Sequence, residues 1–288
     1  LSRKKYPGQW KALYEIIEEE NQQGARIWTQ VHSREINSIL SFETATPFDN
    51  WDVWKEFRAL PIEEQLHKLK TDPALKQKLI DIADKPYEGP EIVGAEARPP
   101  EWDMFYYMDK IRLPHPSVAE IGRERGLSPA AVMIELAIEN DFKAFFRQPL
   151  ANENQDDALA LMKHPRSTVT FSDSGAHVSQ IMDSSLQTHL LSHWVREREA
   201  FTLEEAVRMI TYETSTNWGF HDRGLLREGL TADITVLNPD TVEPRMPEVV
   251  HDLPSGSKRL KQYAEGMLAT VVAGQVVLKE NEHTGALP

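Results

Sequence analysis

The sequence predicts a mixed α/β protein in which parallel βα units are followed by a smaller β-rich segment. Up to about residue 172, stretches with helical spacing of apolar residues alternate with short strand-like stretches, an order typical of parallel βα units. After residue 219, short apolar runs are separated by Gly, Asn and Pro without a helical period, which indicates strands joined by turns. A hydrophobic content of 40% and a charged content of 27% fit an ordinary folded protein. We therefore expect two units, residues 1–218 and 219–288.

The first two elements are a helix and a strand. Residues 10–21 place Trp10, Leu13 and Ile16 on one helical face, and Gly24 ends the helix. Residues 25–34 are rich in Ile, Trp, Thr and Val, which favours a strand. Alternation along this strand places His32 on a polar and aromatic face.

Residues 49–116 form a long, irregular segment. It contains helical stretches near 62–69 and 74–83 and several prolines. We interpret it as an insertion that runs over the surface. Ordered insertions of this length are often lids or oligomer contacts.

The remaining elements are predicted from caps and turns. Ser117 with Glu120, and Thr202 with Glu205, have the spacing of capping boxes at helix starts. The expected elements are helices at 118–125, 129–139, 156–163, 186–199 and 203–214, strands at 143–148 and 168–171, and a hairpin turn at Ala273-Gly274.

Composition excludes several classes of function. A net charge of −13 argues against a nucleic-acid partner, because phosphate binding needs a basic surface. The absence of cysteine excludes disulfides and thiolate metal ligands and fits a cytoplasmic protein. No apolar run approaches the roughly 20 residues of a membrane span, so we expect no membrane association.

Asp173 is the main candidate for a catalytic residue. It follows the apolar strand at residues 168–171 and precedes Ser174, Gly175 and His177 in the sequence SDSGAH. In parallel α/β barrels, catalytic residues lie at the carboxyl ends of strands. Asp and Ser are also ordinary turn formers, so the pattern alone leaves both interpretations open.

Two further histidines lie four residues apart. His189 and His193 share one face of a predicted helix. The pair lacks the intervening glutamate of an H-E-x-x-H zinc motif, so we expect His189 to be at the surface or half-buried. His193, beside Trp194, is a candidate pocket residue.

Several motifs together resemble the carboxyl-terminal part of the metal-dependent amidohydrolase superfamily, in its D-aminoacylase and N-acyl-D-amino-acid deacylase branch. The motifs are VTFSDSGAHV, HWVRERE, TLEEAVRMIT, DRGLLREGLTADITVLNPDTV and the closing ENEHTGALP. The resemblance is continuous from about residue 163 to 288 and looser over residues 26–150.

The resemblance implies a fold and a chemistry. Residues 1–218 would form the carboxyl-terminal part of a (β/α)8 TIM-like barrel with an insertion at about 49–116, and residues 219–288 a small β-sandwich segment. The cofactor would be a divalent metal, most often Zn²⁺, which lowers the pKa of bound water. Asp173 would be its ligand and the general acid/base. The substrate would be an acylated amino acid of D configuration.

Further site residues follow as expectations. His32 is a candidate metal ligand, with a packed or pocket-lining role equally open. His177, His193, Arg34 and Ser174 are candidate substrate-binding residues. Arg147 is a candidate, in addition to Arg34, for binding a substrate carboxylate.

The sequence departs from the amidohydrolase pattern in one respect. None of its ten histidines forms the expected His-x-His pair. The simplest interpretation is that the chain begins partway round the barrel, and strand edges left unpaired would require the missing barrel half or a second copy. A cyclic-amide hydrolase of the dihydroorotase or hydantoinase type, and a catalytically incomplete chain without metal, remain alternatives.

Overall fold

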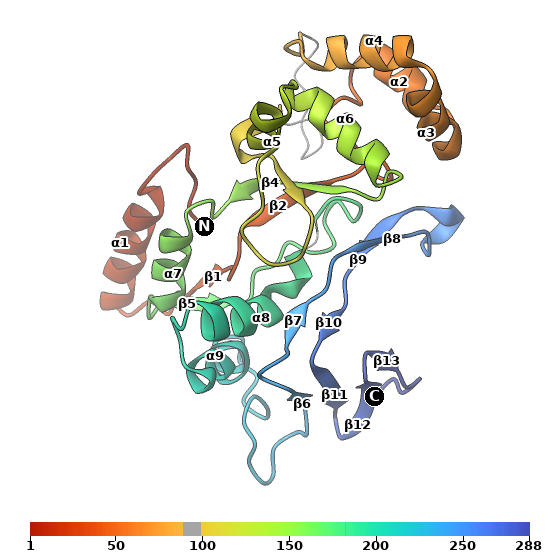
Figure 1. The fold of residues 1–288 in the computed structure, drawn as a ribbon. Helices are drawn as coiled ribbons and strands as arrows, with labels where there is room; N and C mark the ends of the chain where they lie inside the picture. Colours follow the sequence, from red (N-terminus) through yellow and green to blue (C-terminus); the bar gives the residue numbers. More distant parts are fainter. Residues whose placement is uncertain (89–98, 182) are drawn as a thin grey trace.

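The computed structural model describes residues 1–88, 99–181 and 183–288. It is a mixed α/β structure with small separate sheets. The helices lie near β1, β5 and the sheet of β2 and β4, and the carboxyl-terminal strands extend away from them (Figure 1). The α-helices are α1 (Gln9–Gln22), α2 (Asp52–Arg58), α3 (Ile62–Thr71), α4 (Pro73–Ala83), α5 (Val118–Arg125), α6 (Pro129–Glu139), α7 (Gln155–Lys163), α8 (Leu186–His189), α9 (Leu203–Arg208) and α10 (Thr214–Asn217). The 3-10 and π-helical turns are η1 (Trp102–Met104), η2 (Asp183–Ser185), η3 (Leu190–Glu197), η4 (Met209–Glu213) and η5 (Pro254–Gly256).

The sheets consist of short strands. They are β1 (Thr29–Val31), β2 (Ile36–Leu40), β3 (Tyr106–Met108), β4 (Phe145–Ala151), β5 (Ser167–Val169), β6 (Ile234–Leu237), β7 (Glu243–Pro244), β8 (Glu248–Val250), β9 (Arg259–Lys261), β10 (Ala264–Glu265), β11 (Met267–Val272), β12 (Gln275–Lys279) and β13 (Glu282–His283). Within the described part of the chain these strands do not close into a barrel. No described helix is both long and apolar enough to cross a membrane.

One pair of strands is parallel, as predicted. β1 pairs with β5 in the register Thr29 with Ser167 and Val31 with Val169. Apolar residues of α1, α7, α9 and η3, among them Tyr14, Leu161 and Trp194, pack around this pair. The Tyr14 hydroxyl lies 2.5 Å from the hydroxyl of Thr29 and 2.6 Å from that of Ser167, so α1 is bonded to both strands.

A second sheet is antiparallel and was not predicted. Its order is β2-β4-β3, and β4 pairs antiparallel with both neighbours. Only residues 32–35 separate β1 from β2, too few for the crossover that would place β2 parallel beside β1, and β2 pairs with β4 instead. All five residues of β2 are buried although two of them, Asn37 and Ser38, are polar, which hid this strand from a search for apolar runs.

The interpretation of residues 49–116 as a surface excursion was wrong for the described part of this segment. Helices α2 to α4 pack on α5, α6 and β4 around an extensive apolar cluster, and Figure 1 shows them beside α6. Trp54 is fully buried between Phe48 and Phe57. The apolar aromatics at 51, 54 and 57 have helical spacing, a signal that the high polarity of the segment obscured. Residues 89–98 of the predicted insertion lie outside the described residues.

The predicted caps and turns are confirmed. Ser117 and Glu120 form a capping box at α5, and Thr202 and Glu205 form one at α9. The predicted helix at 186–199 is α8 followed by the π-helix η3. The hairpin turn joins β11 to β12 at Ala273-Gly274, where both residues have positive φ, 47° and 81°.

The carboxyl-terminal strands separate into three groups, one of which is the antiparallel pair of β7 and β10. A four-stranded sheet has the order β13-β12-β11-β6. Strands β8 and β9 form an antiparallel pair that reaches away from this sheet in Figure 1. There Leu260 packs with Ile39, Met108 and Phe145 of the β2-β4-β3 sheet.

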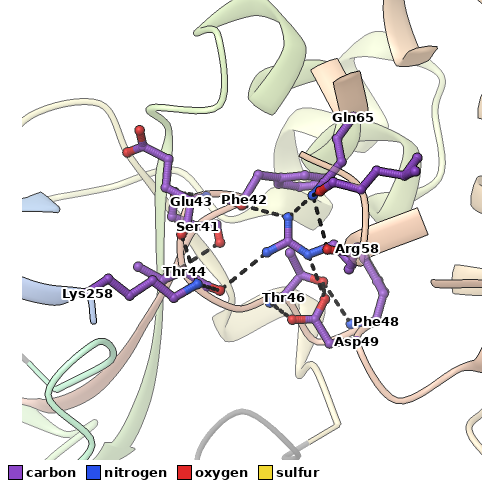
Figure 2. A network of polar contacts seen from close by, with 11 residues as sticks. Ser41, Phe42, Glu43, Thr44, Thr46, Phe48, Asp49, Arg58, Gln65 and Lys258 are labelled. Carbon is purple, nitrogen blue, oxygen red and sulfur yellow. Dashed lines mark hydrogen bonds and ion pairs between the residues drawn. The ribbon is translucent and has the colours of Figure 1, made fainter. Parts of the chain in front are cut away.

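A half-buried arginine, Arg58 of α2, organises the loop after β2. The Arg58 guanidinium donates to the carbonyl of Phe42 at 2.6 Å, to that of Thr44 at 3.3 Å and to Gln65 Oε1 at 2.8 Å, and it lies 3.3 Å from Asp49 (Figure 2). Burial lowers the pKa of Arg58, and the Asp49 carboxylate opposes this shift. Arg58, a residue of α2, therefore holds this loop through its backbone carbonyls.

Replacing Trp54 with alanine tests whether the helical segment contributes to the core. We expect Trp54→Ala to lower the free energy of unfolding by about 3–5 kcal/mol, because it leaves a large cavity. Trp218→Ala is the control, since Trp218 is 56% exposed, and should change stability by less than about 0.5 kcal/mol. Urea denaturation measures both, and equal, small effects would contradict a core at Trp54.

Candidate functional site

Parallel pairing brings two predicted site segments to one edge. Because β1 and β5 run in the same direction, His32 and Arg34 after β1 and the loop after β5 emerge at the same side. The Phe171 amide donates to the Val31 carbonyl at 3.3 Å, which extends the contact past the end of β5. This edge is where the carboxyl ends of strands place catalytic groups in α/β enzymes.

The loop at residues 172–181 carries Asp173, Ser174 and His177, and all three side chains are exposed. Asp173 and His177 have left-handed φ angles of 55° and 47°. Gly175 has φ 102°, a conformation that glycine adopts without a Cβ penalty. The Ala176 amide donates to the Asp173 carbonyl at 3.2 Å, so the loop turns sharply and leaves the Asp173 carboxylate in contact with solvent.

His32 is fully buried beneath this edge. The Arg34 amide donates to His32 Nδ1 at 3.0 Å, which fixes the imidazole against the backbone of its own strand end. The Arg34 side chain is half-buried, and its Nη1 donates to Ser185 Oγ at 2.6 Å. The structure therefore places His32 inside the protein and leaves Arg34 partly accessible.

Arg34 is one wall of a small pocket. The pocket has a volume of about 30 Å³, which is enough for ordered water and below the volume of a typical substrate site. The pocket is lined by Arg34, Glu35, Met108, Ile111, Leu113, His115, Arg147, Gln155, His189 and Pro244. Several elements distant in sequence thus meet beside the predicted substrate-binding arginine.

Arg147 of β4 is fully engaged by protein groups. It forms a buried ion pair with Glu35, its Nε donates to His115 Nδ1 at 2.9 Å, and its guanidinium lies 4.3 Å from the Tyr106 ring centroid. Burial raises the pKa of Glu35, and the charge of Arg147 opposes this shift. These contacts use Arg147 to join β2, β3 and β4, so we assign it a structural role ahead of the predicted role in substrate binding.

The contacts of His115 define its tautomer. Nδ1 accepts from Arg147, so Nε2 carries the proton and donates to the Lys110 carbonyl at 2.8 Å. Burial first, and the Arg147 charge second, lower the pKa of His115 to about 4. His115 is thus a neutral acceptor that orients Arg147 at neutral pH.

The predicted histidine pair lies on α8 and η3. The fully buried Trp194 donates from Nε1 to the Ser33 carbonyl at 2.5 Å, which anchors η3 to the end of β1. The rings of His189 and His193 stack with centroids 4.9 Å apart, and His193 Nδ1 lies 3.1 Å from Glu197 Oε2. Burial first, and then the Arg34 charge, hold the pKa of His189 well below its usual value.

His189 and His193 also line a second small pocket, together with Glu197 and Glu243. The two pockets adjoin, because His189, Ile111, Leu113 and Pro244 belong to both. His193 therefore lines the pocket next to the one that Arg34 lines. His189 is half-buried, in agreement with the expectation of a surface or half-buried position.

The predicted metal ligands do not by themselves form a metal centre. Among residues 1–88, 99–181 and 183–288, no group of three or more His, Asp or Glu side chains has an arrangement suited to a metal ion. His32 is buried with Nδ1 occupied by a backbone amide, and Asp173 is exposed. His32 and Asp173 remain predicted ligands, and the described residues do not complete their set.

Two residues of the pocket were missed at the sequence level, Glu35 and His115. Glu35 follows the predicted strand at residues 25–34, so the strand pattern does not indicate it. The sequence KAFFRQ places Arg147 after two phenylalanines inside a predicted strand, and a charged residue in such a place requires a partner. His115 lies in a loop between prolines and has no comparable signal.

The lowered pKa of His115 predicts a pH-dependent stability. Between about pH 6.5 and 4 the unfolded chain binds a proton at His115 that the folded protein does not, so stability is full above this range and falls as the pH decreases through it. We expect His115→Gln to reduce this loss by about 2–3 kcal/mol. Urea denaturation from pH 7 to 4 measures it, with His67→Gln, an exposed histidine of α3, as the control. Identical pH profiles for wild type and His115→Gln would contradict the assignment.

Two curated relatives come from Alcaligenes xylosoxydans xylosoxydans. An N-acyl-D-aspartate deacylase is 29% identical, with 56% of this chain and 27% of that protein covered, and an N-acyl-D-glutamate deacylase is 31% identical, with shares of 47% and 28%. The chain thus spans about a quarter of the length of either relative.

Solved structures show a more distant likeness. An N-acyl-D-glutamate deacylase from Bordetella bronchiseptica, complexed with zinc and a phosphonate inhibitor, is 18% identical with a TM-score of 0.48, and the match covers 96% of this chain and 44% of that one. D-aminoacylase is 22% identical with a TM-score of 0.39 over 60% of this chain and 34% of that one.

The family model settles the classification. The model described as the amidohydrolase family matches residues 114–278, a range that includes β4, β5, the Asp173 loop and both predicted histidines of α8 and η3. This range is more than half of the chain, and the chain belongs to the amidohydrolase family.

Proposed function

We propose that this chain forms part of a hydrolase that cleaves the amide C–N bond of N-acyl-D-amino acids. The observation that carries the proposal is the parallel pairing of β1 with β5, which directs His32, Arg34 and the Asp173 loop to one edge. The names of the relatives support the substrate class, since both are deacylases of N-acylated acidic D-amino acids. In the complete enzyme, residues 1–218 would belong to a barrel, and the β unit at residues 219–288 would follow it.

Asp173 is the proposed general acid/base. Its carboxylate accepts a proton as water forms a bond to the carbonyl carbon, and it returns the proton to the amide nitrogen as the C–N bond breaks. The products are the carboxylic acid and the free amino acid. The exposed position of Asp173 at the strand-end loop supports this role, because water and substrate must both reach the carboxylate.

The substrate would be held by residues around the same edge. We propose that Arg34 pairs with a carboxylate of the substrate, since a guanidinium matches a carboxylate in shape and charge. Ser174, His177 and His193 are proposed to provide further hydrogen bonds. A divalent metal, Zn²⁺ in the first instance, is the expected cofactor of the complete site, and the described residues hold no full ligand set for it. No step is therefore assigned to the metal.

Asp173→Asn tests the catalytic role. Asparagine keeps the shape and tolerates the left-handed φ of 55°, so the loop should fold unchanged. We expect kcat for N-acetyl-D-glutamate or N-acetyl-D-aspartate to fall by about 10²–10⁴-fold, whereas Asp240→Asn, an exposed aspartate, keeps wild-type activity.

The same assays separate the alternatives. Wild-type protein that hydrolyses dihydroorotate or hydantoin and spares both acyl amino acids would replace the proposal with a cyclic-amide hydrolase. Lack of all activity in zinc-supplemented protein, with no zinc found by elemental analysis, would identify a catalytically incomplete chain.

Arg34→Met tests substrate binding. Loss of a charge-assisted pair should raise KM for N-acetyl-D-glutamate by about 10–100-fold. Lys5→Met is the control, because Lys5 is an exposed residue near the amino terminus. An unchanged KM in Arg34→Met would exclude a contact between Arg34 and substrate.

A further inference from the structure

We propose that the β8–β9 hairpin positions the loop that carries Asp173, and that Lys258 and Leu260 are the residues through which it acts. The structural part of this inference depends only on contacts within the protein. Its catalytic consequence rests on the proposed function of Asp173.

The loop at residues 172–181 requires support from its surroundings. Asp173 and His177 both have left-handed φ angles, 55° and 47°, which side chains other than glycine rarely adopt. Such conformations persist where neighbouring structure holds them. The loop's own bonds run from the Ala176 amide to the Asp173 carbonyl at 3.2 Å and from the Gln180 and Ile181 amides to the His177 carbonyl at 2.7 and 3.1 Å. These bonds shape the loop from within, and contacts with other elements attach it to the rest of the protein.

Two strands hold this loop from outside. The Leu260 amide of β9 donates to the Val178 carbonyl at 2.8 Å, and the Ile39 amide of β2 donates to the Gln180 carbonyl at 2.7 Å. Val178 directly follows His177. The hairpin therefore binds the backbone of the loop one residue after its second left-handed position.

The side chain of Leu260 keeps β9 in place. It is 7% exposed and packs with Ile39, Met108 and Phe145 of the β2-β4-β3 sheet. The backbone bond to Val178 and the apolar contact with Ile39 thus come from the same residue. β9 therefore connects the loop to the β2-β4-β3 sheet, and strand β2 of the same sheet also bonds the loop directly at Gln180.

Lys258 is the second anchor of the hairpin. Its Nζ donates to the carbonyls of Thr44 at 2.7 Å and Glu43 at 3.1 Å (Figure 2). Lys258 and Leu260 are two residues apart, and residues with this spacing face the same side of an extended chain. The carbonyl of Thr44 is also bonded by Arg58, so Lys258 attaches the hairpin to a loop that is already held. Burial, followed by the Arg58 charge, lowers the pKa of Lys258, in keeping with its enclosed position.

Arg259 and Lys261, the residues on either side of Leu260, make no such contacts. Arg259 pairs with Asp252 inside the hairpin at 2.6 Å, and the Lys261 ammonium lies 4.6 Å from the Tyr263 ring centroid. Leu260 and Lys258 therefore contact the β2-β4-β3 sheet and the loop after β2, whereas Arg259 and Lys261 stay in contact with the carboxyl-terminal strands. Lys261 offers a matched control for Lys258.

Hydrogen–deuterium exchange of the purified protein tests the positioning. Lys258→Met keeps the aliphatic part of the side chain and removes the hydrogen-bond donor. We expect the Ala176, Gln180 and Ile181 amides to exchange about tenfold faster in this variant, because the loss of one charge-assisted bond has an effect of that size. Amides of α6, in the apolar core, should exchange at the wild-type rate. Lys258→Arg retains donors and Lys261→Met leaves the contacted face intact, so both should match the wild type. Leu260→Ala should reproduce the effect of Lys258→Met.

The outcomes distinguish the two proposals. Faster loop exchange together with a lower kcat for N-acetyl-D-glutamate and restoration by Lys258→Arg supports both. Faster loop exchange in a protein whose wild type has no deacylase activity supports the positioning and overturns the proposed function. Unchanged loop exchange in both Lys258→Met and Leu260→Ala, or an equal acceleration in α6, would overturn the positioning.

Discussion

The buried ion pair between Glu35 and Arg147 is the interaction on which the arrangement of the site depends. Glu35 precedes β2 and Arg147 lies within β4, so the pair joins the strand that follows Arg34 to the central strand of the antiparallel sheet. Two charges removed from water are tolerated only when each finds partners, and His115, Asn37 and the Tyr106 ring complete the surroundings of Arg147. Arg34, directly beside Glu35, lines the same pocket as this ion pair.

The site is assembled across three parts of the chain. The parallel strands β1 and β5 set the edge, the helix pair α8–η3 brings two histidines to it, and the β8–β9 hairpin contacts the loop after β5. Trp194 is the connection between the first two, because its indole donates to the Ser33 carbonyl at the end of β1. Side chains from distant segments therefore depend on a small number of backbone contacts for their relative positions.

The helices at residues 52–83 have a different physical basis. Their surfaces are strongly charged, as in the pair of Lys76 with Glu135, yet their inner faces bury Trp54, Leu69 and Leu79. A few large aromatic rings bury as much area as a longer aliphatic stripe, so the segment forms a core with few apolar residues. This core supports α6 and β4, which carries Arg147.

The sequence by itself determined the local elements and the family. Capping boxes at Ser117 and Thr202, the turn at Ala273-Gly274 and the strand before Asp173 depend on neighbouring residues, so their chemistry could be predicted. Only the tertiary structure decided that β2 joins an antiparallel sheet, that Arg147 is occupied by Glu35 and His115, and that β9 bonds Val178. These contacts join residues at least 32 positions apart. Single-sequence periodicity carries no information about which distant partner satisfies a buried charge or a free backbone amide.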